Sequence, residues 1–187
     1  MEQITNDDLD VFLIQIKKNL YKGQTKDRQS GTSAFARVNL GLGFEFLLPA
    51  GFGKADDQTA AGIFWSEKRP PNIFINEQKD AGFTLQILEE PETEPLNHNR
   101  ENIKLILEKI DRRVVFYDQG EEKGILWFDY KGFAGNEVTY NLIFLFQIGE
   151  EKVLGSFFCP FEAYDRWRPV VFEMLSTVRK EEADEGI

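Results

Sequence analysis

The stretch of residues 124–160 constrains the fold of this chain more than any other part of its sequence. It has the pattern of three consecutive antiparallel strands, of which the middle one, residues 138–148, is the most informative. Its even positions from 140 to 146 are all apolar or aromatic, and Ile143 and Leu145 make the opposite face apolar as well. Because a strand that is apolar on both faces must be covered on both, we expect further layers above and below it.

Other segments supply the remaining strands and helices. Further strands are predicted at residues 44–48, 62–66, 72–76, 83–89 and 112–117. One helix is predicted from an apolar stripe at helical spacing, made by Ile103, Ile106, Leu107 and Ile110. A closing helix is predicted in the same way from Tyr164, Trp167, Val171, Leu175 and Val178. Two helices on opposite faces of a mostly antiparallel β-sheet predict an α+β fold, arranged as an α/β/α sandwich.

The starting points of these two helices follow from local chemistry. Asn97 or Asn99 is expected to cap the first helix with its side chain. Pro169 is expected at the first position of the closing helix, with residues 164–168 forming a preceding turn. The alternative is a longer helix that contains Pro169 in its interior.

The chain is predicted to fold as one domain with extensions at both ends. Residues 1–33 are expected to form an N-terminal helix and a flexible linker, 34–180 the domain, and 181–187 an acidic tail. The helix is predicted from Leu9, Phe12, Leu13, Ile16 and Leu20. Its apolar stripe is expected to pack on its own domain, and the alternative is that it recruits a partner.

The net charge of -10 and a pI near 4.7 narrow the classes of partner. Nucleic acid and anionic membranes are excluded as expected partners, because both require a basic face. A basic protein partner is compatible with this charge. The N-terminus has no secretory signal pattern, no apolar run approaches about 18 residues, and one cysteine forms no intrachain disulfide, so a cytoplasmic location is expected.

The sequence predicts no catalytic residues, no metal site and no cofactor. His98 is the only histidine, which excludes Ser-His-Asp triads, Cys-His pairs and multi-histidine metal sites within one chain. His98 is expected to be an exposed residue near a helix start, and Cys159 a small buried apolar residue. The acidic and glycine-rich stretches lack the spacing of a calcium loop or a phosphate loop.

Two clusters combine aromatic and basic side chains, which are enriched at the centres of protein interfaces. The candidate protein-binding residues of the first cluster are Trp65, Lys68, Arg69, Pro70 and Pro71. Those of the second are Arg166 and Arg168, on either side of Trp167. The alternative is structural: Trp167 seats the closing helix on the core, and Trp65 covers the sheet.

Four segments carry a resemblance to a known family: FEFLLPAGF at 44–52, FTLQI at 83–87, the three-strand stretch 124–160, and YDRWRPVVFEMLSTV at 164–178. Together they resemble the PsbP-like superfamily. That superfamily includes photosystem II extrinsic subunits, a eukaryotic Ran-GTPase-binding protein and bacterial domains of unknown role. The resemblance implies an α/β/α sandwich with a non-catalytic binding or assembly role, and the N-terminal helix is additional to it.

The predicted function is a non-catalytic module that binds another protein, with its oligomeric state open. The alternatives are a carrier of a small apolar ligand, with a pocket between sheet and helix, and a cytoplasmic immunity or secretion-accessory protein. A cavity larger than a few waters favours the carrier. An open surface patch that bears a tryptophan favours the protein-binding module.

Overall fold

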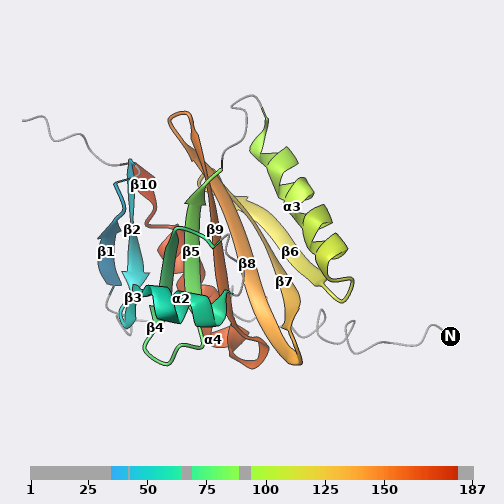
Figure 1. Cartoon of the computed structure of the whole chain (residues 1–187). Helices are drawn as coiled ribbons and strands as arrows, with labels where there is room; N and C mark the ends of the chain where they lie inside the picture. Colours follow the sequence, from blue (N-terminus) through green and yellow to red (C-terminus); the bar gives the residue numbers. More distant parts are fainter. Residues whose placement is uncertain (1–34, 42, 65–68, 89–93, 181–187) are drawn as a thin grey trace, which may run out of the picture.

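The computed structural model describes residues 35–41, 43–64, 69–88 and 94–180, and it arranges them as two antiparallel sheets with three α-helices (Figure 1). The predicted N-terminal helix and linker at 1–33, the candidate residues Trp65 and Lys68, and the tail at 181–187 lie outside the described residues.

The main sheet has seven strands in the order β3-β4-β5-β9-β8-β7-β6, and every neighbouring pair is antiparallel. The strands are β3 (Phe52–Lys54), β4 (Asn72–Asn76), β5 (Gly82–Ile87), β6 (Val115–Glu122), β7 (Ile125–Ala134), β8 (Glu137–Ile148) and β9 (Glu151–Pro160). The predicted three-strand stretch is therefore confirmed as β7, β8 and β9, with β8 in the middle of the three.

A second, three-stranded sheet has the order β1-β2-β10 and consists of β1 (Phe35–Asn39), β2 (Phe44–Pro49) and β10 (Arg179–Lys180). Phe44, Phe46 and Leu48 alternate along β2 and are buried against the main sheet. The ring of Phe44 meets that of Phe146 edge-on at 5.1 Å. This small sheet was not predicted as a unit, because β10 is formed by two charged residues that carry no strand pattern.

One face of the main sheet, which we call the α4 face, holds the largest part of the core. The even-numbered residues of β8 from Tyr140 to Phe146 point to this face and pack under β2 and the helix α4 (Tyr164–Leu175). A short 3-10 turn, η1 (Phe161–Ala163), leads into α4. The core therefore forms where two covering layers, β2 and α4, meet the same row of aromatic side chains.

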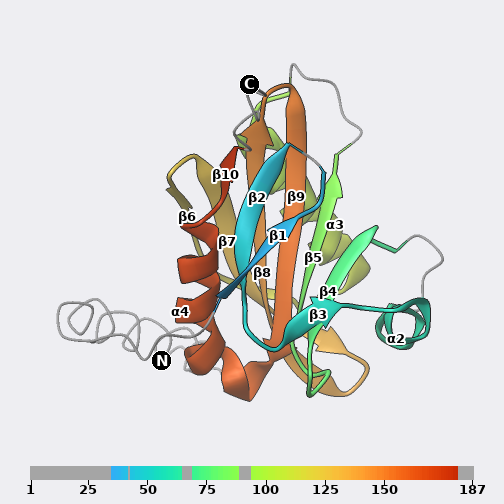
Figure 2. The same ribbon diagram turned by 90° about the vertical axis from the view of Figure 1, so that its left-hand side faces the viewer.

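The opposite face, which we call the α2–α3 face, carries the helices α2 (Asp57–Ile63) and α3 (Leu96–Ile110) (Figures 1 and 2). Under α3, the core comprises Phe128, Ile143 and Leu145. Ile143 is 8% exposed and Leu145 is 0% exposed, so the prediction that β8 is covered on both faces is confirmed. The α/β/α arrangement follows directly from that double burial.

The predicted strand at residues 62–66 is wrong. Residues 57–63 form α2 instead, and β3 lies between residues 48 and 62, where no strand was predicted. The side chain of Asp56 caps α2 by accepting a hydrogen bond from the amide of Thr59 at 2.7 Å. This cap starts a helix in a sequence too short and too rich in alanine to show an apolar stripe.

Pro169 lies inside α4, so the longer-helix alternative is right and the expected position at the helix start is wrong. Pro169 is exposed, and it has no amide hydrogen to donate to the carbonyl of Asp165, the usual acceptor for that position. The helix tolerates the lost hydrogen bond because its inner face is held by Trp167 and Val171.

The start and the stripe of α3 also differ from the prediction. The residue at the N-cap position is Pro95, without a side-chain hydrogen bond, so neither Asn97 nor Asn99 caps the helix. Ile106 and Ile110 belong to the predicted buried stripe, yet both are exposed. The helix is rotated so that it packs through Leu96, Ile103 and Leu107.

Candidate functional site

The most unusual surface in the described residues is the outer side of α3. Three of its aliphatic side chains, which we call the α3 row, face solvent: Leu105 at 53% exposed, Ile106 at 53% and Ile110 at 76%. Large aliphatic side chains grouped on one helix, with polar residues around them, are typical of a surface that another chain covers.

Ile106 and Ile110 of the α3 row lie on the flank of the helix that points away from β6, and Leu105 lies on its outer side, opposite the buried Leu96, Ile103 and Leu107. On the other flank, Lys104 donates a hydrogen bond from Nζ to Oε1 of Gln119 at 2.9 Å. The same ammonium group lies 5.1 Å from the ring centre of Phe116, so this flank is attached to β6. Ile106 and Ile110 are four residues apart and therefore lie together on the opposite flank.

Basic side chains surround the C-terminal end of the α3 row. Residues 104–113 carry four basic and two acidic side chains, in a chain whose net charge is -10. Lys109 and Arg112 are exposed there. Arg113 binds Asp111 through two nitrogens, at 3.0 and 2.7 Å, and its guanidinium stacks over the ring of Phe133 at 4.5 Å. The row therefore presents apolar contact area next to positive charge.

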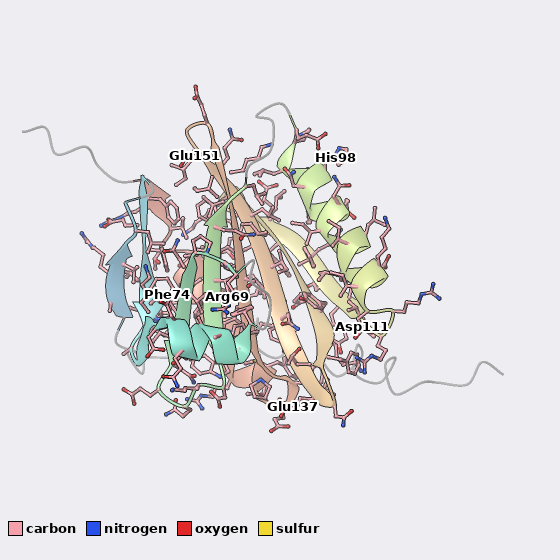
Figure 3. All side chains as sticks on the ribbon, viewed as in Figure 1. Arg69, Phe74, His98, Asp111, Glu137 and Glu151 are labelled. Carbon is pink, nitrogen blue, oxygen red and sulfur yellow. The ribbon has the colours of Figure 1, made fainter. Side chains whose placement is uncertain are left out.

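Arg69, Pro70 and Pro71 lie on the same side of the sheet as α3. They precede β4, and Nε of Arg69 donates a hydrogen bond to the carbonyl of Phe64 at 3.0 Å, next to the end of α2. Arg69 and Pro71 are exposed. Figure 3 shows Arg69 beside α2, with His98 and Asp111 at the two ends of α3 across the same face.

The second predicted cluster divides between two environments on the other face. Arg166 is exposed, and its guanidinium lies 4.9 Å from the ring centre of Trp167. Trp167 is buried against Phe52 and Phe157, so the structural interpretation of this tryptophan is confirmed. Because α4 and α3 cover opposite faces of the sheet, the structure does not bring Arg166 together with Arg69.

Arg168 points inward and belongs to a buried polar network that the sequence patterns did not reveal. Its Nε donates to Oδ2 of Asp129 at 2.9 Å, and the Tyr140 hydroxyl donates to the same oxygen at 2.9 Å. The amide of Asp118 donates to the other carboxylate oxygen at 2.9 Å, at a register shift in β6. The guanidinium of Arg168 also stacks over the rings of Trp127 and Phe172.

Burial dominates the titration of this network. Desolvation raises the pKa of Asp129 above its ordinary value, although the charge and hydrogen bond of Arg168 act in the opposite direction. The pKa of Tyr140 is also raised, first by burial and then by the neighbouring carboxylate. A carboxylate enclosed by three donors within the core ties β6, β7, β8 and α4 together, which is a structural role.

The single histidine, His98, lies near the start of α3, and the single cysteine, Cys159, lies in β9, so they belong to different parts of the fold. The side chain of His98 is 55% exposed and lies 3.3 Å from a carboxylate oxygen of Glu94, as expected for a residue near the start of a helix. Cys159 is buried in β9, which confirms its predicted role, and burial raises the pKa of its thiol. Among the residues that the structure describes, no three His, Cys, Asp or Glu side chains form a group suited to a metal ion.

The interior between β2, α4 and the main sheet is filled by side chains. The gap lined by Phe44, Phe83, Phe144 and Met174 has no room for a water molecule: the volume that a water could occupy is about 0 Å³. A larger depression of about 290 Å³ lies at the surface, between the turn at Lys123 and the start of β10. This gap between the sheet and α4 is therefore too small to be the pocket that the carrier hypothesis requires. In the same part of the chain, no helix is both long and apolar enough to cross a bilayer.

Comparison with known proteins identifies the fold. No protein-family model and no curated protein sequence matches the chain. The solution structure of cyanobacterial PsbP (CyanoP) from Synechocystis sp. PCC 6803 matches with a TM-score of 0.60 and 14% identity, over 82% of this chain and 96% of that one. The Ran-binding protein Mog1p of Saccharomyces cerevisiae matches with a TM-score of 0.53 and 11% identity, over 80% and 96%. The chain therefore has the PsbP-like fold, as the resemblance predicted.

Proposed function

We propose that this protein is a non-catalytic protein-binding module whose interface is centred on the α3 row. The observation that carries this proposal is the exposure of Leu105, Ile106 and Ile110 on one helix, whereas the large aliphatic side chains of α2 and α4 are buried or half-buried. The yeast structure with the same fold is that of a Ran-binding protein, which shows that such a domain can serve to bind a protein.

The size of the α3 row sets the extent of the interface. Full burial of one such side chain contributes about 1.5–3 kcal/mol, so three that are half to three-quarters exposed contribute about 4 kcal/mol together. Two proteins lose translational and rotational freedom when they associate, at a cost of about 4–15 kcal/mol. The contribution of the row offsets only the lower end of that cost. A stable complex therefore needs contacts beyond the row.

The neighbouring α2–α3 face supplies those contacts in our proposal. A standard interface covers roughly 800 Å² on each partner, more than one helix flank presents. Arg69, Pro70 and Pro71 lie on this face and form one rim of the proposed surface, and Trp65 and Lys68 join them by their proximity in sequence. Arg166 and Arg168 fall outside it, because they belong to the α4 face.

Two observations support the non-catalytic part of the proposal. The chain has a single histidine, which is exposed beside Glu94, and a single cysteine, whose raised thiol pKa makes it a poor nucleophile. The buried carboxylate of Asp129 is enclosed by its own donors and reaches no solvent. We also propose a cytoplasmic location, on the grounds of the acidic composition and the single cysteine.

The test compares capture of a partner by variants of the full chain. Tagged wild-type protein and three variants are used to recover bound proteins from native lysate: Ile106→Ser with Ile110→Ser, Arg69→Ser, and Arg166→Ser. The affinity of each variant for the recovered partner is then measured with purified proteins. We expect the double variant to bind at least about tenfold more weakly, Arg69→Ser to bind several-fold more weakly, and Arg166→Ser to bind like wild type.

Arg166→Ser is the matched control, since it also replaces an exposed helical residue with serine. Circular dichroism and urea unfolding establish that each variant is folded. Equal affinity of the wild type and the Ile106→Ser, Ile110→Ser variant for the same partner would exclude the α3 row as the interface.

A further inference from the structure

A surface depression of about 290 Å³ lies at one end of the main sheet, where the turns β6–β7 and β8–β9 meet β10. Figure 2 shows β10 beside the turn that joins β6 and β7. The apolar side chains that line the depression are Ile125, Phe146, Ile148 and Val178. Among the described residues, its lining has two basic side chains, Lys123 and Arg179, and no acidic one. Its volume is that of about ten water molecules at about 30 Å³ each, so a ligand of about ten non-hydrogen atoms fits.

We propose that this depression binds a small carboxylic acid with an apolar body, and that the carboxylate lies between Lys123 and Arg179. The site shares no residue with the α3 row, so this inference goes beyond the function proposed above. It also differs from the carrier hypothesis, in which an apolar ligand lies between the sheet and a helix. Apolar walls with a few charged groups at one point are the usual composition of a site for a small ligand.

The backbone position of Lys123 is unfavourable for lysine. The turn between β6 and β7 consists of Lys123 and Gly124, and both have positive φ, of 51° and 79°. Such a turn favours asparagine or glycine at its first position, because the left-handed backbone crowds a longer side chain. A strained residue that holds a charge beside a depression is typical of a functional site.

The ammonium group of Lys123 can bind a ligand without leaving its present partner. It donates a hydrogen bond to the carbonyl of Ser176 at 3.4 Å, just beyond the last residue of α4. This hydrogen bond is long and exposed. Because an ammonium group has three hydrogens, it can hold this carbonyl and a carboxylate at the same time.

Arg179 contributes the second positive charge. Its Nε donates a hydrogen bond to Oε1 of Glu45, and Nε of Arg37 lies 3.3 Å from the other oxygen of that carboxylate. One carboxylate thus neutralises only one of these two arginines. The side chain of Arg179 is 60% exposed, and a guanidinium group can bind a ligand carboxylate through parallel hydrogen bonds.

Neighbouring acidic residues limit the charge of the ligand. Glu122 precedes Lys123 and Glu150 follows Gly149, and both glutamates are exposed. They repel a phosphate, with up to two negative charges, more strongly than a single carboxylate. The apolar lining requires carbon next to that carboxylate. A free carboxylic acid and the C-terminal carboxylate of a peptide share this chemistry.

Titration of the full-length, nitrogen-15-labelled protein with phenylbutyrate tests the site. We expect amide shifts centred on residues 123–125, 147–149 and 178–179, with a Kd between about 10 µM and 1 mM. The neutral phenylbutyramide should bind at least about fivefold more weakly, because it lacks the charge. N-acetylphenylalanine serves as the probe for a peptide C-terminus, and the acid that binds more tightly identifies the source.

Lys123→Asn should weaken the binding of phenylbutyrate at least about fivefold. Its urea midpoint should equal or exceed that of the wild type, because asparagine suits the turn. Lys79→Asn is the matched control: Lys79 also has a positive φ, of 59°, and its loss changes the net charge equally, but it lies in the turn between β4 and β5. It should bind like wild type. Lys123→Arg should retain the affinity within about twofold.

Equal affinity of the wild type and Lys123→Asn for phenylbutyrate overturns the proposal. So do equal affinities for the acid and its amide, tighter binding of inorganic phosphate than of the acid, and the absence of shifts at about 10 mM acid. None of these measurements involves the α3 row, so the carboxylate site and the proposed function fail separately.

Discussion

Replacement of Arg168 by methionine is expected to destabilise the fold by about 3–5 kcal/mol at neutral pH. The change removes the positive partner of Asp129, a carboxylate that is 0% exposed, and leaves only the Tyr140 hydroxyl and the Asp118 amide to satisfy it. Removing one member of a buried ion pair typically costs about 3–5 kcal/mol, because the remaining charge stays desolvated. Methionine keeps the length and most of the apolar contact area with Trp127.

The loss should depend on pH. Burial already raises the pKa of Asp129 from its ordinary value of 3.8, and Arg168 is the main group opposing that rise. In Arg168→Met the folded-state pKa therefore rises further above the unfolded value. Protonation of the carboxyl removes the cost of burying its unpaired charge. The destabilisation is therefore small near pH 4 and grows as pH rises through the folded-state pKa.

Urea unfolding of the wild type and the Arg168→Met variant at pH 5.0 and pH 7.5 measures this effect. The double variant Asp129→Leu, Arg168→Met serves as the control, because it removes both charges and should be more stable at pH 7.5 than Arg168→Met alone. A loss below about 1 kcal/mol in the single variant, equal at both pH values, would refute the assignment of Asp129 as a buried ion that depends on Arg168.

Three further outcomes follow from the packing. Gly155→Ala should cost about 2 kcal/mol in urea unfolding, since its Cβ would lie 2.1 Å from the ring of Phe144, whereas Gly53→Ala has open space and should be nearly neutral. Cys159 should not react with a thiol reagent such as Ellman's reagent until the protein unfolds, and fast labelling of native protein would contradict its burial. Ile110→Lys should change the unfolding free energy by less than about 0.5 kcal/mol, and a loss above 2 kcal/mol would contradict its exposure.

The layered fold could be predicted because one strand carried an unambiguous pattern. Ile143 and Leu145 made the second face of β8 apolar. A strand that is apolar on both faces belongs in a sheet that is covered on both faces. The burial of Trp167 could be predicted for the same kind of reason, as part of a five-residue helical stripe. In each case many residues pointed to one answer.

The surface of α3 could not be predicted in the same way. The sequence of this helix has apolar residues at 103, 105, 106, 107 and 110, an arc wider than one packing face. Periodicity shows that such an arc exists, but the rotation of the helix on the sheet decides which part is buried. That rotation depends on distant partners, such as Lys104 with Gln119 on β6. The excess of apolar residues was the available signal that part of the helix would remain exposed.

The buried network depended on contacts that no local pattern encodes. Arg168 sits between an aromatic residue and a proline, which suggested a surface anchor. The structure turns it toward Asp129, which is 39 residues earlier in the chain. An aspartate inside a largely apolar strand was the one indication, because a buried carboxylate requires donors. The sequence alone does not reveal which arginine supplies them.

Photo-crosslinking from position 105 tests the central claim, that the α3 row is a surface covered by protein, most directly. A photoreactive phenylalanine replaces Leu105 in the full-length chain in its native cells, and a parallel variant carries it at Arg166 on the opposite face. The proposal predicts adducts specific to position 105 that join this chain to a discrete protein partner. Illumination that yields no such adduct from position 105, or the same products from both positions, would contradict it.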